Sequence, residues 1–464
     1  PTVTFDPAVA STLTNQSGAW QSDNKTYKVQ ATIDDKGIDA NEVTIDITGA
    51  KDVAGNLQVD HTAVKGLEVD TKNPTASYAS TIKSQNTNGA ADVASDDDPV
   101  VSYTVTFSEP IAAIQASDID VAGGTLKSTT LALSADKTTA TFDVEASDNS
   151  VANLVVKVKD TVKDLNGNKL VESSSAAVTV DTENPGVAIT DDQSGIAFDS
   201  ENTVAYTLTF TEGVQKIGTD DLTVTGATVD SIVHKAGENT ATVNVTVTDG
   251  STANVSITAK KSIVDMAGNP MVQAVVDNNQ TVDTVNPSTD GAPTVSDPTI
   301  TDTDDGKKLD VSFTFSEAMD TGIAPTVTFD PAVASTLTNQ SGAWQSDGKT
   351  YKVQATIADQ GIDANEVTID ITGAKDVAGN LQVDHTAVKG LEVDTLNPTA
   401  SYASTIKSQN TNGAADVASD ADPVVAYTVT FSEPVAAITP SDIDVAGGAL
   451  VANTLRLIEG GSKA

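Results

Sequence analysis

The chain consists largely of short stretches in which apolar and polar residues alternate. In "VVSYTVTF" at 100–107, apolar residues fall at every second position, with hydroxyl-bearing residues between them. Successive side chains of a strand point to opposite faces, so this alternation predicts a strand that is buried on one face. The alternation returns at 140–144 and 154–158. The residues that it assigns to a buried face are Val101, Tyr103, Val105, Phe107, Ala140, Phe142, Val144, Leu154, Val156 and Val158.

The same pattern recurs along the chain at 204–210 and at 309–315. Each unit of this kind contains about seven such stretches, separated by turn residues, and it shows no helical periodicity. We therefore predict an all-β chain, built as a tandem array of immunoglobulin-like antiparallel β-sandwich domains. The chain contains no cysteine, so the Cys–Trp–Cys mark of antibody domains is missing and the prediction concerns the architecture alone.

A five-residue phrase, Asp-Thr-x-Asn-Pro, defines the repeat frame. It begins at residues 70, 181, 283 and 394, so its steps are 111, 102 and 111 residues, which sum to 324. Residues 1–124 recur at 325–448 with nine substitutions, at the same offset of 324. This frame predicts five domains, with boundaries at 1–69, 70–180, 181–282, 283–393 and 394–464.

The repeat frame also predicts that the two terminal segments are partial domains. Residues 1–69 match the back of a unit and lack its front strands, and 394–464 match the front of a unit and lack its back strands. We expect the chain to be a piece of a longer array. Open strand edges invite pairing with other chains, so end-to-end self-association is also expected.

Charge narrows the choice of partners. The chain carries 65 acidic and 26 basic residues, which gives a formal net charge of −39. Such a field repels nucleic acids and anionic membranes and attracts cations. Thiol catalysis and Cys-ligated zinc are excluded by the absence of cysteine, no apolar run is long enough to span a membrane, and the three histidines form no repeated triad with Ser and Asp. We therefore predict no enzyme, no nucleic-acid partner and no membrane insertion in this segment.

Strand direction predicts where the acidic residues meet. Consecutive antiparallel strands alternate in direction, so the Asp-Thr phrase, the Glu after the strand at 204–210 and an Asp-x-x-Gly-Asn turn fall at one end of a sandwich. In the second unit these features are Asp181, Asn184, Glu212, Asp265 and Asn269. The other candidate residues are Asp70, Asn73, Glu109, Asp164, Asn168, Asp283, Asn286, Glu317, Asp376, Asn380, Asp394, Asn397 and Glu433, together with Asp98 from an acidic loop at the opposite end.

Clustered carboxylates favour a hard cation. Each carboxylate raises the pKa of its neighbours, and Ca²⁺, which takes six to eight oxygen ligands, removes that penalty. Simpler roles stay open for several of these residues. The Asp-x-x-Gly-Asn segment is also good turn chemistry, the Glu could be a solvated strand end, and the acidic loop with Asp98 could serve only solubility. The Pro of each phrase favours an extended, stiff linker.

Three motifs carry a resemblance to a known family. "VSYTVTFSEPIAAIQASDIDVAGGTL", "VKDLNGNKL" and "AAVTVDTENP" resemble the bacterial immunoglobulin-like repeats of large secreted surface adhesins. The resemblance covers essentially the whole chain, and the second unit departs from it only slightly, with "FTEGVQ" and "TVTGA". It implies a stalk segment of a cell-surface protein, often one exported through a type I system, with calcium at the joints between repeats.

These observations predict a calcium-stiffened extender of a bacterial surface adhesin. It would project an adhesive domain from the cell for attachment or biofilm formation, with calcium ions and neighbouring repeats as its partners. Two alternatives remain. The chain could be the subunit of an extracellular filament, joined through split terminal domains, or a multivalent module that binds glycans or proteins. The low aromatic content of 4% counts against the second alternative.

Overall fold

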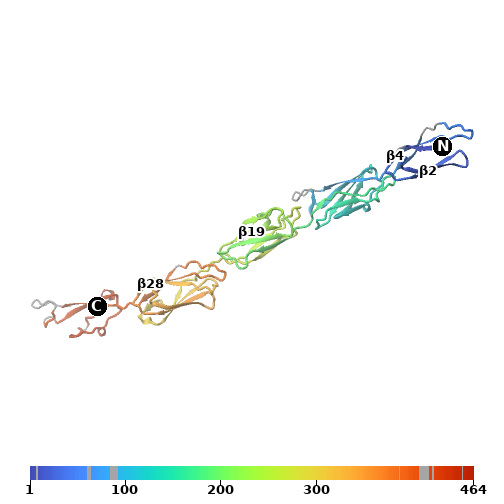
Figure 1. Cartoon of the computed structure of the whole chain (residues 1–464). Helices are drawn as coiled ribbons and strands as arrows, with labels where there is room; N and C mark the ends of the chain where they lie inside the picture. Colours follow the sequence, from blue (N-terminus) through green and yellow to red (C-terminus); the bar gives the residue numbers. More distant parts are fainter. Residues whose placement is uncertain are drawn as a thin grey trace. The chain divides into compact units, whose positions relative to one another are not determined.

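The computed structural model describes residues 1–6, 9–59, 64–83, 92–385, 387–406, 417–420, 423–451 and 453–464. Contacts divide the chain, which Figure 1 draws in full, into two compact units. The first contains Pro1–Ala197, Asn202–Thr248 and Ala253–Val282, and the second contains Phe198–Glu201, Asp249–Thr252 and Asp283–Ala464. Strands dominate both units, and the described residues include short 3-10 turns but no helix long and apolar enough to cross a membrane.

Residues 70–180 form a sandwich of two antiparallel sheets. The four-stranded sheet has the order β10 (Gly124–Leu133), β11 (Thr139–Ala146), β8 (Val100–Phe107) and β6 (Ala76–Ile82). The three-stranded sheet has the order β13 (Ser173–Ser174), β12 (Val155–Val158) and β9 (Ile119–Ala122). A short parallel pair, β7 (Val93–Ala94) with β14 (Thr179–Val180), joins the first part of the domain to its last strand.

The next sandwich, within residues 181–282, repeats this plan. Its four-stranded sheet has the order β15 (Val187–Asp191), β16 (Thr203–Phe210), β19 (Thr240–Val247) and β18 (Ala227–Val233). Its three-stranded sheet has the order β17 (Leu222–Thr225), β20 (Val255–Ala259) and β21 (Val275–Gln280). A single parallel bridge between Ala197 and Val282 stands in the place of the β7–β14 pair.

The third sandwich, within residues 283–393, has two four-stranded sheets. One has the order β22 (Thr294–Val295), β24 (Lys308–Thr314), β27 (Thr350–Ile357) and β26 (Leu337–Trp344). The other has the order β23 (Thr299–Thr301), β29 (Val388–Asp394), β28 (Asp363–Thr372) and β25 (Thr326–Asp330), and β23 runs parallel to β29. The predicted all-β, immunoglobulin-like architecture is thus confirmed.

Alternation correctly predicted the cores of these sandwiches. The side chains of Val101, Tyr103, Val105 and Phe107 are buried between the two sheets of residues 70–180, as are those predicted at 140–144 and 154–158. The equivalent residues of β16 and β24 fill the next two cores. Residues 1–69 contain a smaller cluster around Val9, Leu13, Val43 and Val69. Its strands are β1 (Thr2–Phe5), β2 (Leu13–Trp20), β3 (Tyr27–Ile33), β4 (Asp39–Thr48) and β5 (Val64–Asp70).

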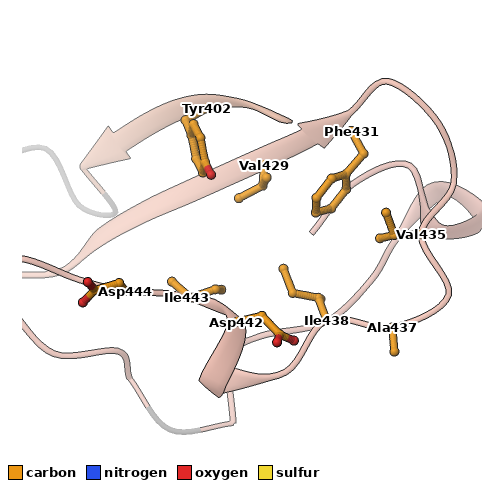
Figure 2. Close-up of a pocket in the computed structure, with 9 residues that line it drawn as sticks. All are labelled: Tyr402, Val429, Phe431, Val435, Ala437, Ile438, Asp442, Ile443 and Asp444. Atoms are coloured by element: carbon orange, nitrogen blue, oxygen red, sulfur yellow. The ribbon is translucent and has the colours of Figure 1, made fainter. Parts of the chain in front are cut away.

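The described residues of 394–464 form one two-stranded sheet, which presents the same apolar face. The hairpin of β30 (Ala400–Ile406) and β31 (Val425–Phe431) borders an open groove (Figure 2), which Tyr402, Val429 and Phe431 help to line. Tyr427 is 63% exposed, whereas its counterpart at an offset of 324, Tyr103, is 1% exposed. Val429 stays buried, as its counterpart Val105 is, so this apolar face is exposed only in part.

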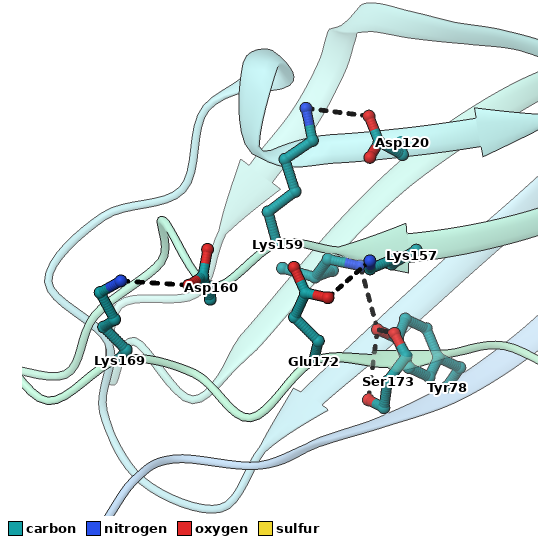
Figure 3. Close-up of polar contacts among 9 residues, drawn as sticks. Tyr78, Asp120, Lys157, Lys159, Asp160, Lys169, Glu172 and Ser173 are labelled. Carbon is teal, nitrogen blue, oxygen red and sulfur yellow. Dashed lines mark hydrogen bonds and ion pairs between the residues drawn. The ribbon is translucent and has the colours of Figure 1, made fainter.

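Polar contacts support the sandwich of residues 70–180 (Figure 3). The Tyr78 hydroxyl donates to the Ser173 carbonyl at 2.6 Å and accepts from the Val158 N–H at 3.1 Å, so it ties β6 to the other sheet. Ion pairs of Lys157 with Glu172 and of Lys159 with Asp120 lie on the partly exposed face. Exposed pairs of this kind contribute little to stability, so the half-buried Tyr78 hydroxyl is the more important link between the sheets.

Candidate metal centre

The Asp and the Thr of the Asp-Thr phrase make different contacts. Thr182 is fully buried and belongs to the sandwich that precedes it. Its hydroxyl accepts from the Ser150 N–H at 3.0 Å and donates to the Ser147 carbonyl at 2.7 Å, and its own N–H donates to the Ser150 carbonyl. The sequence pattern did not predict this role of Thr182. The same pairing recurs for Thr71 with Ile38, Thr284 with Ser251 and Thr395 with Ile362.

The aspartate of the phrase faces two other acidic side chains. Asp181, Glu212 and Asp265 each offer a carboxylate oxygen, and these oxygens lie within 4.8 Å of one another. The structure therefore brings together the three acidic features that strand direction placed at one end of the sandwich. Two further groups share this arrangement. They are Asp70, Glu109 and Asp164, and Asp283, Glu317 and Asp376.

The turn after β20 fixes the buried member of the group. Asp265 Oδ1 accepts from the N–H groups of Gly268 at 2.6 Å and Asn269 at 2.9 Å, and Oδ2 accepts from Asn269 Nδ2 at 2.7 Å. Gly268 has a φ of 99°, a conformation that glycine adopts without strain. The turn role of Asp-x-x-Gly-Asn and the presence of its Asp in the acidic group therefore coexist.

The asparagines of these turns make hydrogen bonds to other segments of the chain. Asn269 Nδ2 donates to the Asp181 carbonyl at 2.8 Å, and its Oδ1 accepts from the Asp96 N–H at 2.7 Å. Asn380 likewise bonds the Asp283 carbonyl and the Asp199 N–H, each at 2.8 Å. Because these amide oxygens already accept from a main-chain N–H, Asn269 and Asn380 link segments in this structure. Their expected ligand role has no direct support here.

Three of the remaining asparagines also donate hydrogen bonds through their side-chain amides. Asn168 Nδ2 donates to the carboxylate of Asp164 and, at 3.3 Å, to the Asp70 carbonyl. Asn184 Nδ2 donates to Asp96 Oδ2 and to the Pro270 carbonyl, both at 3.1 Å, and Asn286 Nδ2 donates to Asp199 Oδ2 at 3.3 Å. The ligand role expected of Asn73, Asn168, Asn184, Asn286 and Asn397 stays a prediction.

The acidic loop contributes a residue other than the one expected. Asp98 is buried, but it belongs to none of the three carboxylate groups in the described residues. Asp96, two positions earlier, is the loop residue that meets Asn269 and Asn184. In the part of the chain that the structure describes, Asp394 and Glu433 belong to none of the groups of three acidic side chains.

Electrostatics within the groups penalise full ionisation. Burial, followed by repulsion from Asp265 and Asp181, raises the pKa of Glu212 to about 7. Burial and the neighbouring aspartates also raise the pKa values of Glu109 and Glu317. Lys72 opposes the rise at Glu109 and Lys349 opposes it at Glu317, whereas Glu183 adds to the rise at Glu212. The group of Asp181, Glu212 and Asp265 therefore has the most negative surroundings of the three.

The donor set of these groups fits a hard cation. All their ligand atoms are carboxylate oxygens, which suit Ca²⁺ or Mg²⁺ better than zinc or copper. Glu109 Oε1 and Glu433 Oε1 are both buried without a hydrogen-bond partner. A bound cation would satisfy such an atom. A cation placed among three carboxylates would also offset their mutual repulsion.

Comparisons with known proteins place the middle sandwich in a family. A family model described as "Bacterial Ig-like domain" matches residues 181–282. No curated protein matches the sequence. Among solved structures, a chain of a bacterial ice-binding adhesin is similar at 17% identity and a TM-score of 0.32, covering 66% of this chain and 94% of its own length.

Two further solved structures are similar to this chain at lower identity. The N-terminal eight Ig domains of Down Syndrome Cell Adhesion Molecule match at 13% identity and a TM-score of 0.26, over 85% of this chain and 45% of theirs. A marsupial T cell receptor matches at 9% identity and a TM-score of 0.22, over 60% of this chain and 94% of its own. Because these TM-scores are low, the assignment of an Ig-like fold depends on the observed strand order and on the family match. Residues 181–282 are therefore a bacterial Ig-like domain, set in a tandem array of Ig-like sandwiches.

Proposed function

We propose that this chain is a calcium-stiffened extender segment of a bacterial cell-surface adhesin, which projects an adhesive domain for attachment or biofilm formation. In this proposal the chain is extracellular, its repeats are spacers and the domain boundaries stay where the Asp-Thr phrases place them. The bacterial Ig-like match at 181–282 supports the adhesin class. No enzymatic role is proposed, since the candidate residues form acidic groups that suit cation binding rather than catalysis.

The single observation that carries the proposal is the recurrence of one acidic group. The first member of each group, such as Asp181, immediately precedes the Thr that closes the sandwich before it, whereas Glu212 and Asp265 belong to the sandwich after it. A cation bound to all three side chains would therefore fix the linker to the following domain. The proposed ligands are the carboxylates of the three groups, with Asp394 and Glu433 as part of a further one.

The expected affinity is that of other extracellular calcium modules, roughly 10⁻⁴–10⁻³ M. At a tenfold excess of free calcium over Kd, each filled site would stabilise the folded state by roughly 1.4 kcal/mol. That is a useful fraction of the stability of a domain of this size. With the sites emptied, mutual repulsion within each group would no longer be offset, and the linkers should bend more freely.

Small-angle X-ray scattering on the full chain, in millimolar calcium and in chelator, tests this function. We expect the maximum particle dimension to fall and the flexibility to rise in chelator. Asp181→Asn with Glu212→Gln should loosen one linker in calcium while leaving the others unchanged. Asp220→Ala with Asp249→Ala removes two exposed charges outside the groups and is the matched control. Scattering that is indifferent to calcium in the unmodified chain would refute stiffening by calcium.

A further inference from the structure

A second polar feature lies inside the sandwich of residues 181–282, away from the acidic groups. β15 and β21 are edge strands of the two different sheets, and they lie next to each other. Asp191 on β15 is paired in register with Tyr206, and Asp277 on β21 is paired with Ile257. Tyr206 and Ile257 are both completely buried. Directly paired residues share a face, so both aspartates are on the inner faces of their sheets.

The hydroxyl of Tyr206 completes this feature. The residue is 0% exposed, and its hydroxyl oxygen has no hydrogen-bond partner. Burial raises the pKa of the Tyr206 hydroxyl first, and the charges of Asp191 and then Asp277 raise it further. A buried hydroxyl without a partner is costly, since water would have satisfied it in the unfolded chain. The hydroxyl and the two carboxylates thus share one region between the edge strands.

The preceding sandwich shows what this region contains when charge is absent. There Tyr103 occupies the place of Tyr206 and is paired with Ser80, the counterpart of Asp191. Ser175, which bonds Val156 across the strands, is the counterpart of Asp277, and its hydroxyl lies near that of Tyr103. Two aspartates therefore stand where the preceding sandwich has two serines, around a tyrosine whose hydroxyl is buried without a hydrogen-bond partner in both sandwiches.

Local turn formation does not explain why both positions carry an aspartate. Asp191 Oδ1 accepts from the Gln193 N–H and Asp277 Oδ1 accepts from the Asn279 N–H, each at 3.0 Å. These bonds use one oxygen of each carboxylate, and a serine hydroxyl can make the same kind of bond. Asp277 is 8% exposed, so its charge is largely removed from water. Two negative charges on facing inner edges repel each other unless a cation lies between them.

We propose that a divalent cation of the calcium class binds between β15 and β21, held by the carboxylates of Asp191 and Asp277 with the Tyr206 hydroxyl as a neutral oxygen ligand. Such an ion would connect the edge strands of the two sheets and so brace the sandwich itself rather than a linker. The site is separate from the acidic group at Glu212, because β16 continues from Tyr206 to Phe210, roughly 13 Å at the rise of a strand. It does not depend on the proposed function.

The experiment counts bound calcium per full-length chain by equilibrium dialysis. Asp191→Ser with Asp277→Ser installs the residues of the preceding sandwich, which keeps the fold plausible, and should bind one ion fewer than the unmodified chain. Adding these changes to Asp181→Asn with Glu212→Gln should remove one more ion, so failure of either site is distinguishable from failure of the other. Asp220→Ser with Asp249→Ser is the charge-matched control and should bind the full number.

Terbium provides a second readout that reports on Tyr206. It is the only tyrosine of residues 181–282, which also lack tryptophan. Tb³⁺ luminescence excited through tyrosine should fall in the Asp191→Ser/Asp277→Ser chain and in Tyr206→Phe, which leaves both carboxylates in place. An unchanged ion count together with unchanged luminescence in the serine variant would overturn the proposal. If the serine variant fails to fold, Tyr206→Phe decides, because undiminished luminescence there contradicts a site beside the hydroxyl.

Discussion

The sharpest test of the acidic groups replaces Glu212 by glutamine, which keeps the shape of the side chain and removes its charge. The pKa of Glu212 lies at about 7 in the folded chain, against an ordinary value of 4.5. The folded state therefore holds the proton more tightly than the unfolded state. A penalty on folding is absent below the unfolded pKa, grows as pH rises from 4.5 and is complete above about 7.

A pKa rise of this size corresponds to about 3 kcal/mol at most. Glu212 is partly exposed, so solvent screening reduces the effect, and we expect about 1 kcal/mol. In chelator at pH 8, Glu212→Gln should therefore be more stable than the unmodified chain by that amount. For a domain of about 100 residues this raises one unfolding transition by roughly 4–8 °C. At pH 5 the difference should nearly vanish.

Calcium should reverse the sign of this difference. Glutamine offers a neutral oxygen where glutamate offers a charge, so the variant should gain less from millimolar calcium at pH 8 than the unmodified chain does. Differential scanning calorimetry resolves the transitions of a multidomain chain, for which a single midpoint is not meaningful. Glu201→Gln, an exposed residue of the same sandwich, is the control. An advantage in chelator that is equal at pH 5 and pH 8 would show that ionisation of Glu212 is not its cause.

Three other substitutions probe the described contacts. Thr182→Val removes the buried hydroxyl and should destabilise the 70–180 transition by about 1–3 kcal/mol, leaving the 181–282 transition in place, as calorimetry will show. Asn269→Ala removes the acceptor of the Asp96 N–H, so hydrogen exchange at that amide should accelerate, and unchanged exchange would contradict the bond. Lys72→Ala removes a positive charge that opposes the raised pKa of Glu109, so calcium titration should show tighter binding at that group, and weaker binding would contradict the electrostatic account.

Much of the fold follows from two rules, the two-residue alternation of side chains along a strand and the reversal of direction between consecutive antiparallel strands. Alternation placed Tyr103 and Phe107 in the core because a strand has only two faces. Reversal of direction at each turn brought Asp181, Glu212 and Asp265 to the same end, although they are far apart in sequence. These conclusions require no knowledge of loop conformation, and they were available from the sequence.

The contacts that were missed depend on loop conformation. Alternation gives no reason for Thr182 to be buried beyond the last strand, and its pairing with Ser150 requires the shape of the loop after β11. Asn269 was expected as a ligand because amide oxygens bind calcium, but the orientation of its amide depends on Asp96, which belongs to the preceding sandwich. The contact of Asp96 with Asn269 was not predicted for the same reason, and the candidate ligand role of Asp98, in the same acidic loop, stays a prediction.

The short parallel pairs bear on how such a chain responds to tension. In the sandwich of residues 70–180, β7 and the terminal strand β14 run in the same direction, and β23 and β29 do so in the third sandwich. A pull on the two ends of either sandwich moves these partners in opposite senses along their length, so their hydrogen bonds are sheared together rather than peeled apart one by one. Forced unfolding is governed by the unfolding rate, and simultaneous rupture slows it. The sandwich of residues 181–282 has one bridge, Ala197 with Val282, in the place of a pair. Under a steady pull, we expect that sandwich to open before its neighbours.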